Sequence, residues 1–344
     1  MLAVCGWRGA GKTTLLERVI PELAHRGLTV AAVKHHTHKG ALAVDQPGKD
    51  SDRLFRAGAD IHLTAPAEAF DRTHREDDDD LEAVLSGLLE GHDLVLVEGH
   101  KDTPLPKVWL CGEHDQGPPE GVSEVLAVLP LDADRPRRLQ EILDEWLPRT
   151  WSGIPVYGGV LVGGAGTRIG HPKQLLPHRK GTFLEAVVAA IDAVLPHVVL
   201  LGGGAIPAAC EQLPRQADAP GLAGPIAGML AALRWAPGHA WLFAACDLPM
   251  LSPDAVRWLV GQRRPGRWAV LPDCGKGVEP LLALYEPQVR GPLQRLAGNP
   301  EAGPRLLERH PKVQVLAPPA ELRTCWRNIN TPADLAALGE DPRP

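Results

Sequence analysis

Two glycine-rich segments, each with a lysine close behind it, are the parts of this 344-residue chain best suited to phosphate chemistry. The first spans residues 6–13, reads Gly-Trp-Arg-Gly-Ala-Gly-Lys-Thr and satisfies the pattern G-x-x-x-x-G-K-[ST]. In such a loop backbone N–H groups point at phosphate oxygens, the lysine neutralises the β- and γ-phosphates, and the hydroxyl ligates Mg²⁺. We therefore expect a nucleotide site, with Thr13 as metal ligand, made by Gly6, Gly9, Gly11, Lys12, Thr13 and Thr14.

A carboxylate follows an apolar run later in the same half. Residues 94–97 read Leu-Val-Leu-Val, which is typical of a buried parallel strand, and Glu98 comes directly after them. An acidic residue at the end of such a strand, beside a phosphate loop, is suited to the Mg²⁺ or water side of a bound nucleotide. The alternative is an ordinary charge at a strand end.

Three histidines lie within four positions between these two motifs. His35, His36 and His38 follow Lys34 directly. Imidazoles at this density could bind a metal, and beside a phosphate site they could equally contact an anion together with Lys34. A solvated loop is the third possibility, and the residues leave all three open.

The second glycine-rich segment, residues 163–170, lacks the G-x-x-x-x-G-K pattern but has cations at fixed offsets. Arg168 and Lys173 make it a candidate for binding a triphosphate. Further along, an apolar strand at 241–245 is followed by Cys246 and Asp247. Open α/β sheets bind ligands at the carboxyl ends of their parallel strands, so Asp247 is the best candidate for a metal ligand. The alternative for Asp247 is a turn aspartate before Leu-Pro.

The elements that must position these residues alternate between strand and helix in both halves. Residues 2–5 are an apolar strand, residues 13–26 have helical spacing of apolar side chains, and a second strand follows at 29–34. This order predicts an α/β fold with a P-loop NTPase sheet over residues 1–149. A helix expected at 135–147 is followed by a proline- and glycine-containing linker at 150–155, and a second, Rossmann-like sheet is expected over 156–344.

Composition and charge restrict the partners of the chain. Residues 1–150 hold 17 basic and 27 acidic side chains, and residues 151–344 hold 19 and 15, so the net charges are -10 and +4. An acidic front half is a poor nucleic-acid binder, whereas the rear half suits a polyanionic small molecule. We expect no nucleic acid, no membrane span and, because no signal peptide is recognisable, a cytoplasmic location. The six cysteines lack metal-ligand spacing and are expected to be buried thiols.

The motifs of the first half, taken together, resemble the molybdopterin-guanine dinucleotide biosynthesis adaptor proteins, which are GTP-binding P-loop proteins. The resemblance covers residues 1–148 and implies that this half binds GTP. It rests on the phosphate loop, KHHTHKG, DQPGKDS, AGA, LVLVEGHK and Leu105-Pro106-Lys107, in this order.

The second half resembles the molybdenum cofactor guanylyltransferases, which belong to the wider nucleotide-diphospho-sugar transferase superfamily. The matching segments are LVGGAGTRIGHPK, GPIAG, CDLP and NINTPADL, across residues 156–338. The resemblance implies a Mg²⁺ on Asp247 that bridges the phosphates of GTP, and Asp218 near the nucleoside. It further implies that Leu161, Gly163, Gly164, Arg168 and Lys173 surround GTP, and that Asn328 and Asn330 lie by the metal and the second substrate.

The two resemblances imply one reaction, the transfer of GMP from GTP to the terminal phosphate of molybdopterin or its molybdenum form, with release of pyrophosphate. Such a phosphate is largely ionised near pH 7 and needs no protein nucleophile, so Lys173, Arg168 and Asp247 would act by positioning and electrostatics. Molybdoenzyme apoproteins or their chaperones are candidate protein partners. Two alternatives are a cytidylyl- or sugar-phosphate nucleotidyltransferase, and a P-loop GTPase or kinase with a non-catalytic rear half.

Overall fold

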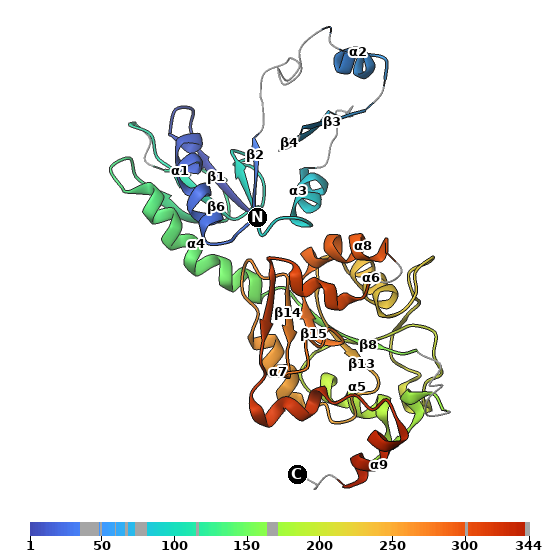
Figure 1. The fold of residues 1–344 in the computed structure, drawn as a ribbon. Helices are drawn as coiled ribbons and strands as arrows, with labels where there is room; N and C mark the ends of the chain where they lie inside the picture. Colours follow the sequence, from blue (N-terminus) through green and yellow to red (C-terminus); the bar gives the residue numbers. More distant parts are fainter. Residues whose placement is uncertain are drawn as a thin grey trace.

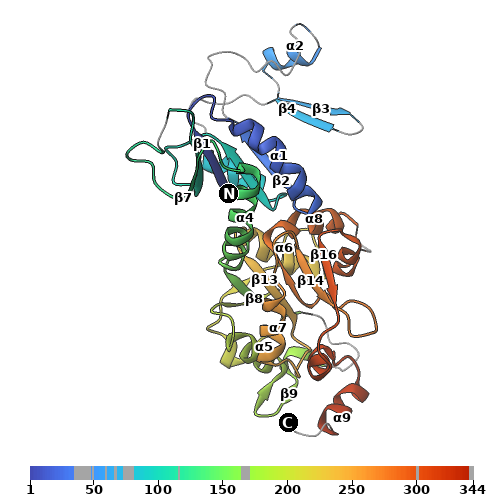
Figure 2. The same ribbon diagram turned by 90° about the vertical axis from the view of Figure 1, so that its left-hand side faces the viewer.

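The chain folds into two α/β domains, each built on its own sheet, as the sequence predicted. The structure, a computed structural model, describes residues 1–34, 48, 50–58, 60–65, 68–72, 81–114, 117–163, 171–299 and 302–340. The domains lie one above the other, joined by a long helix that passes from the first to the second (Figures 1 and 2).

The first domain contains a fully parallel five-stranded sheet. Its strand order is β2-β5-β1-β6-β7, so the strand that leads into the phosphate loop lies at the centre. Helices α1 and α4 cover one face, and α3 covers the other. The bounds are β1 Leu2–Gly6, α1 Lys12–His25, β2 Val30–Lys34, α3 Leu81–Leu89, β5 Leu94–Glu98, β6 Lys107–Leu110, β7 Val125–Leu129 and α4 Arg135–Ser152.

Helix α1 shows why the opening of the chain folds as its pattern predicts. Its buried side chains, Leu15, Leu16, Val19 and Leu23, share one face because three- and four-residue spacing repeats each turn. The helix begins directly after Gly11 and is followed by Gly27, whose φ of 81° reverses the chain toward β2. The helix therefore starts at the phosphate loop and ends at the opposite edge of the sheet.

A small arm lies away from this sheet (Figure 1). It consists of α2, Asp50–Arg56, and the antiparallel hairpin of β3, Ile61–Ala65, with β4, Glu68–Arg72. The buried carboxylate of Asp52 joins its parts, because it accepts hydrogen bonds from the Gly48 N–H and from the guanidiniums of Arg56 and Arg72.

The second domain contains a seven-stranded mixed sheet of order β12-β11-β8-β13-β15-β14-β16, in which β15 alone runs antiparallel to its neighbours. Helices α5 and α7 cover one face, and α6 and α8 cover the other. The strands are β8 Val156–Leu161, β11 Val198–Leu201, β12 Arg215–Gln216, β13 Ala240–Ala245, β14 Ala269–Pro272, β15 Leu282–Tyr285 and β16 Val313–Leu316. The helices are α5 Phe183–Asp192, α6 Pro225–Trp235, α7 Pro253–Gly261, α8 Arg290–Ala297 and α9 Pro332–Glu340.

Shorter elements complete the described part of the second domain. A two-stranded hairpin precedes α5, and five 3₁₀ turns lie between the main elements. The hairpin is β9 Pro177–His178 with β10 Gly181–Thr182, and the 3₁₀ turns are Lys173–Leu175, Ala208–Cys210, Pro287–Val289, Pro304–Arg309 and Ala320–Trp326.

The expected end of α4 at Leu147 is wrong, because the helix continues through Pro148 to Ser152. Its buried residues Leu139, Leu143, Leu147 and Trp151 recur every four positions, so one apolar face runs past the proline. Burial of Trp151, at 4% exposure, outweighs the hydrogen bond that the proline removes. Residues 150–152 of the expected linker are therefore the last turn of a helix.

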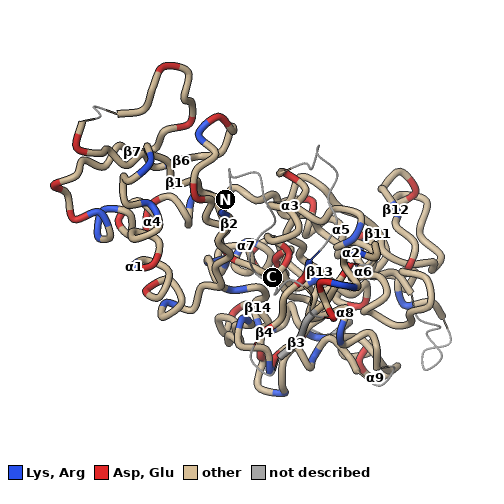
Figure 3. Tube along the Cα trace, turned by 90° about the horizontal axis from the view of Figure 1, so that it is seen from above, with Lys and Arg blue, Asp and Glu red and all other residues tan. Residues whose placement is uncertain are grey.

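Three surface properties of the described residues bear on possible partners. None of their helices is both long and apolar enough to cross a membrane. Acidic and basic residues are interspersed along both domains in Figure 3. All six cysteines lie in the described residues and outside any disulfide, and only Cys274 is more than marginally accessible.

Candidate nucleotide sites

The phosphate loop occupies the carboxyl edge of the first sheet, between β1 and α1. The ammonium of Lys12 lies 2.8 Å from the carbonyl oxygens of both Gly6 and Trp7, so the lysine folds back over its own loop. Gly6 has a φ of 146°, and a Cβ built there would come within 2.5 Å of the Leu110 oxygen. Only glycine fits this crossing of loop and neighbouring strand.

Thr13 and Glu98, predicted to serve the metal of the first domain, are in direct contact. The Thr13 hydroxyl lies 2.9 Å from both carboxylate oxygens of Glu98. The ammonium of Lys34, at the end of β2, is 3.2 Å from the Thr13 hydroxyl and 3.2 Å from Glu98. A lysine cation therefore lies on the hydroxyl and the carboxylate that are expected to hold Mg²⁺. Thr14, the neighbour of Thr13 in α1, is exposed.

Arg135 is a residue of this site that the sequence motifs did not reveal. Its guanidinium donates to the carbonyl oxygen of Ala10 in the phosphate loop at 2.8 Å and to that of Pro130 at 2.9 Å. It also donates to the carbonyl of Cys111, which follows β6. The first residue of α4 thus fixes the loop, although 125 positions separate it from Ala10.

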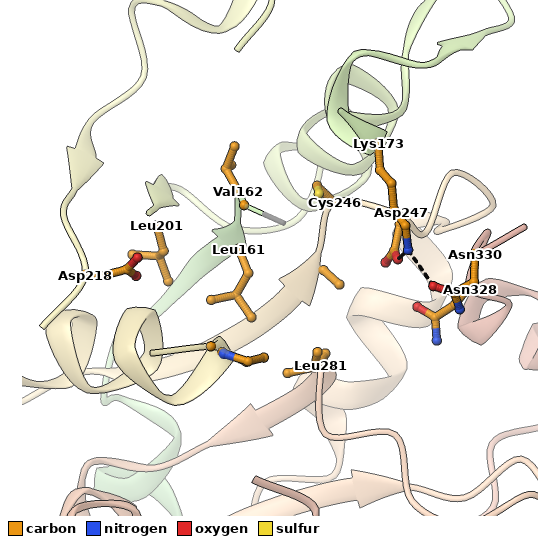
Figure 4. A pocket seen from close by; sticks show the side chains of 14 residues that line it. Leu161, Val162, Lys173, Leu201, Asp218, Cys246, Asp247, Leu281, Asn328 and Asn330 are labelled. Carbon is orange, nitrogen blue, oxygen red and sulfur yellow. Dashed lines mark hydrogen bonds and ion pairs between the residues drawn. The ribbon is translucent and has the colours of Figure 1, made fainter. Parts of the chain in front are cut away.

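A cavity of about 490 Å³ opens at the carboxyl ends of β8, β11 and β13 in the second domain (Figure 4). It brings together residues that the sequence places up to 169 positions apart. Seven residues predicted for the transferase site line it, namely Leu161, Gly163, Lys173, Asp218, Asp247, Asn328 and Asn330.

One end of this cavity is polar and centred on Asp247. The Lys173 ammonium lies 2.7 Å from one carboxylate oxygen of Asp247, Oδ2, and 2.5 Å from the Asn330 side-chain oxygen. The other carboxylate oxygen, Oδ1, is buried and has no hydrogen-bond partner in the described structure. Figure 4 shows Lys173, Asp247, Asn328 and Asn330 gathered at this end.

The segment that carries Asn330 is held in place by Asp334 at the start of α9. The Asp334 carboxylate accepts hydrogen bonds from the Thr331 hydroxyl and N–H, each at 2.8 Å, and from the Asn330 N–H at 3.1 Å. These hydrogen bonds, led by that of the Thr331 hydroxyl, lower the pKa of Asp334. The Ile329 N–H in turn donates to the carbonyl of Asp247, so the two loops are joined directly.

The other end of the cavity is formed by apolar side chains and Asp218. A Cβ on Gly228 would lie 2.8 Å from the Leu161 side chain and 3.3 Å from the Asp218 carboxylate, so this glycine keeps the floor open. Cys246, between the two ends, is an unreactive thiol, because burial and then the charge of Asp247 raise its pKa to about 12.

The donor set fits a divalent cation that is shared with a nucleotide. Mg²⁺ in phosphate-transfer sites takes one or two carboxylates, and substrate phosphates and water complete its coordination. Asp247 supplies one carboxylate, and its buried, unpartnered Oδ1 is the kind of atom that a cation satisfies. No group of three or more His, Cys, Asp or Glu suited to a metal occurs among the described residues, so an all-protein metal site is not indicated there.

Some predicted residues fall outside the described part of the chain, and some lining residues were not predicted. Gly164, Arg168, His35, His36 and His38 belong to the undescribed segments. The missed lining residues are Val162, Leu201, Gly224, Pro225, Ala245, Cys246 and Leu281. Gly224, Pro225 and Cys246 belong to the GPIAG and CDLP segments. Their position in these motifs is the sequence feature that could have identified them as lining residues.

Comparison with known proteins gives separate matches for the two domains. Residues 1–129 match the family model described as molybdopterin guanine dinucleotide synthesis protein B, and residues 158–314 match the MobA-like NTP transferase domain. The front part is 38% identical to the molybdopterin-guanine dinucleotide biosynthesis adapter protein of Haemophilus influenzae, over 43% of this chain and 89% of that protein.

The rear part is similar to two proteins named probable molybdenum cofactor guanylyltransferase. It is 31% identical to that of Bacillus thuringiensis, over 39% of this chain and 69% of that protein. It is 27% identical to that of Pelotomaculum thermopropionicum, over 52% of this chain and 89% of that protein. The two sets of relatives thus account for different domains.

Proposed function

The chain belongs to the molybdopterin-guanine dinucleotide biosynthesis adapter proteins through its first domain and to the molybdenum cofactor guanylyltransferases through its second, and from this premise we propose how its residues perform the transfer. It is a nucleotidyltransferase of molybdenum cofactor biosynthesis with a fused adaptor domain. Its small-molecule substrates are GTP and molybdopterin.

The reaction joins two anions. An oxygen of the terminal phosphate of molybdopterin forms a bond to the α-phosphorus of GTP. The bond from that phosphorus to the oxygen that bridges to the β-phosphate breaks, and pyrophosphate leaves with the electron pair. The products are molybdopterin guanine dinucleotide and pyrophosphate. The task of the protein is therefore to bring the two phosphates together and to stabilise the charge that develops.

The two ends of the second-domain cavity suit different parts of GTP. The apolar end, with Leu161 and Asp218, would take the nucleoside, because apolar side chains cover its faces and a carboxylate can accept from its N–H or O–H groups. The polar end, with Lys173 and Asp247, would take the phosphates. A Mg²⁺ held by Asp247 would neutralise phosphate charge when bound. Gly163 lines the cavity, and Gly164 and Arg168 are proposed to bind GTP with it.

The second substrate would enter beside the asparagines. Asn328 and Asn330 line the same polar end, and their side-chain amides can donate to and accept from a phosphate or a pterin. Lys173 lies next to Asn330, where an ammonium would counter the charge of an incoming phosphate. The observation that carries the proposal is this convergence of Lys173, Asp247 and Asn330 in one cavity with Asp218.

The first domain is proposed to bind a second GTP on Lys12, Thr13 and Glu98, where the Thr13 hydroxyl and the Glu98 carboxylate are the groups that would hold Mg²⁺. Because this domain belongs to the adapter family, we propose that it helps to deliver molybdopterin guanine dinucleotide. The proposed recipients are molybdoenzyme apoproteins or their chaperones.

Substrate specificity tests the proposed function. The full chain is incubated with molybdopterin and GTP, CTP or UTP in Mg²⁺, and pyrophosphate and orthophosphate are measured separately. We expect pyrophosphate with GTP only, and only when molybdopterin is present. Pyrophosphate from CTP, or from a sugar phosphate with UTP, would overturn the assignment of substrates. Orthophosphate without pyrophosphate would move the activity to the first domain.

A further inference from the structure

We propose that a second groove of the transferase domain binds an acidic segment of a partner polypeptide. The groove, here called the hairpin groove, lies between the β9–β10 hairpin, helix α5 and the segment that leads into α7. Its volume is about 340 Å³, and among the described residues it shares no lining residue with the nucleotide cavity. That the segment belongs to a molybdoenzyme or its chaperone rests on the proposed function, whereas the binding itself does not.

The floor and one wall of the hairpin groove are apolar. Ala186, Ala189 and Ala190 line it from one face of α5, and their small side chains leave the floor open. Pro249 and Leu251, both buried, form the opposite wall. The alanine N–H groups are used within the helix and proline has none, so these surfaces offer few directed donors. Sites for small molecules depend on precisely placed polar groups, so an extended chain with apolar side chains suits this groove better.

Two cations lie at the mouth of the hairpin groove. Arg179 and Lys180 form the exposed turn between β9 and β10, and neither side chain makes an ion pair with any described residue. Glu185 also lines the groove, but its carboxylate accepts from the Thr182 N–H at 2.6 Å and caps α5. Unpaired cations beside an apolar groove are complementary to a peptide in which acidic side chains flank an apolar one.

The backbone of Arg179 indicates that its side chain serves a ligand. Pairing of His178 with Gly181 leaves a two-residue turn, and Arg179 has a φ of 52° there. Turns of this length favour glycine or asparagine at positive φ, because a Cβ is strained in that region. The guanidinium makes no hydrogen bond with a described residue that would offset the strain. Strain of this kind is retained at ligand sites, where the side chain is needed for binding.

His178, directly before the turn, offers an unsatisfied polar atom. Its ring lines the groove, and its Nε2 is buried without a hydrogen-bond partner among the described residues. Buried polar atoms in proteins are normally hydrogen-bonded, and the backbone of a bound peptide would supply the partner.

The hairpin groove adjoins the nucleotide site and is open to a partner. The His178 ring packs on Phe183, with 6.0 Å between ring centroids, and Phe183 is buried against Ile329. The Ile329 N–H donates to the carbonyl of Asp247, and Pro249 follows Asp247 by two positions. The hairpin projects from the second domain on the side away from the first (Figure 2). A polypeptide bound there would lie beside the site proposed to make the dinucleotide.

Selection from a peptide library tests the proposal on the full chain. Phage that display random twelve-residue peptides are selected on the wild type and, in parallel, on the double variant Arg179→Gly, Lys180→Ser. Enriched peptides are synthesised with a fluorescein label, and fluorescence polarisation gives their Kd. Arg309→Ser removes an exposed arginine outside the groove and is the matched control.

We expect the peptides enriched on wild type to carry acidic residues on both sides of an apolar one. Their Kd should rise about fivefold in the double variant, which is the strength of two exposed ion pairs expressed as a ratio, and should not change in Arg309→Ser. Ala189→Glu should also raise the Kd and Ala189→Lys should lower it, because Ala189 is an exposed part of the floor. The absence of acidic enrichment, or an equal Kd for wild type and double variant, overturns the proposal.

Urea denaturation separates loss of binding from loss of folding. Glycine relieves the strain at position 179, so the midpoint of Arg179→Gly should equal or exceed that of wild type. A lower midpoint would show that Arg179 serves the fold rather than a ligand.

Pyrophosphate release from GTP and molybdopterin, measured on the same variants, separates this proposal from the proposed function. It should be unchanged, because the substituted residues do not line the nucleotide cavity. Peptide binding by a wild type that makes no pyrophosphate would keep the hairpin groove and reject the proposed function. Transfer without selection of acidic peptides would keep the proposed function and reject the groove.

Discussion

The carboxylate of Asp93 in the first domain lies 2.6 Å from the ammonium of Lys312 in the second, and both groups are almost completely buried. The same carboxylate accepts from the Trp268 indole at 2.7 Å and from the Thr29 N–H at 2.7 Å. The Lys312 ammonium also donates to the carbonyl of Gly27, just after α1. One buried charge pair therefore joins the end of α1 and the start of β5 to the starts of β14 and β16.

This junction fixes the direction in which each nucleotide site faces. Asp93 precedes β5, and Glu98 ends that strand at the phosphate loop. Trp268 precedes β14, which runs parallel to β13, and Asp247 follows β13. Each site thus lies at the carboxyl edge of its sheet and the junction lies at the amino edge. The path from one site to the other therefore runs along one strand in each domain, and each strand is about 15–20 Å long.

Removing Asp93 should destabilise the whole chain. Asp93→Ala leaves the Lys312 ammonium buried without its partner and the Trp268 indole without an acceptor, so we expect a loss of about 3–5 kcal/mol in the free energy of unfolding. Urea denaturation followed by tryptophan fluorescence measures it. The matched control is Asp144→Ala, which breaks the exposed pair with Arg26 and should change stability by less than about 0.5 kcal/mol. Equal effects of the two variants would show that the junction contributes no more than a surface pair.

The stability of the junction should also depend on pH through His310. Its ring stacks on Trp268 at 5.3 Å, and burial, followed by the charges of Arg295 and Lys312, lowers its pKa below the ordinary 6.5. Protonation then favours the unfolded chain, so stability is fully present above about pH 6.5 and falls as the pH decreases toward the folded-state pKa.

The variant His310→Gln isolates this contribution. Unfolding free energies between pH 8 and pH 5.5 should decrease less in the variant than in wild type. His178, whose pKa burial also lowers, contributes with the same sign in both proteins and cancels in the comparison. If the unfolding free energy decreases equally with pH in the two proteins, His310 is not the cause of the pH dependence.

Asp247→Asn should abolish nucleotide transfer while the fold persists. The substitution keeps the shape of the side chain and removes the charge that would hold the metal, at a strand end where no core cavity opens. Pyrophosphate release at saturating GTP and molybdopterin measures the loss, with Asp254→Asn as a control on an exposed carboxylate of the same domain. Activity within about threefold of wild type, a loss below ~1 kcal/mol, would show that Asp247 is not the metal carboxylate.

Local patterns were sufficient to predict the α/β class, helix α1 and the placement of Asp247. Each depends on residues close in sequence: the spacing of Leu15, Val19 and Leu23, or a buried strand followed directly by an acid. In an open α/β sheet, ligands bind at the carboxyl ends of the parallel strands. A residue that directly follows such a strand in the sequence is therefore expected at that edge of the sheet. The confirmed families rest on the same short motifs.

Contacts between distant residues could not be predicted in this way. Trp268 and Lys312 lie 175 and 219 positions from Asp93, and nothing near them in sequence indicates a buried partner. The end of α4 is hard to predict for a different reason, because a proline usually ends a helix whereas here the apolar spacing continues past it to Trp151. Arg135 resembles an ordinary charge at a helix start until the fold brings Ala10 beside it.

The opposite orientation of the two sites predicts that Lys12 and Lys173 serve separate tasks. Lys12→Ala should weaken GTP binding and any slow hydrolysis in the first domain, while transfer with saturating substrates largely survives. Lys173→Ala should lower saturated transfer by about 10²–10³, or ~3–4 kcal/mol, because it removes a cation from phosphates whose charge shifts during the reaction. Pyrophosphate release and GTP binding by calorimetry are measured on both variants. An equal loss of saturated transfer in Lys12→Ala would show that the two sites are not independent, and that the first domain either gates the transferase site or is a working part of it.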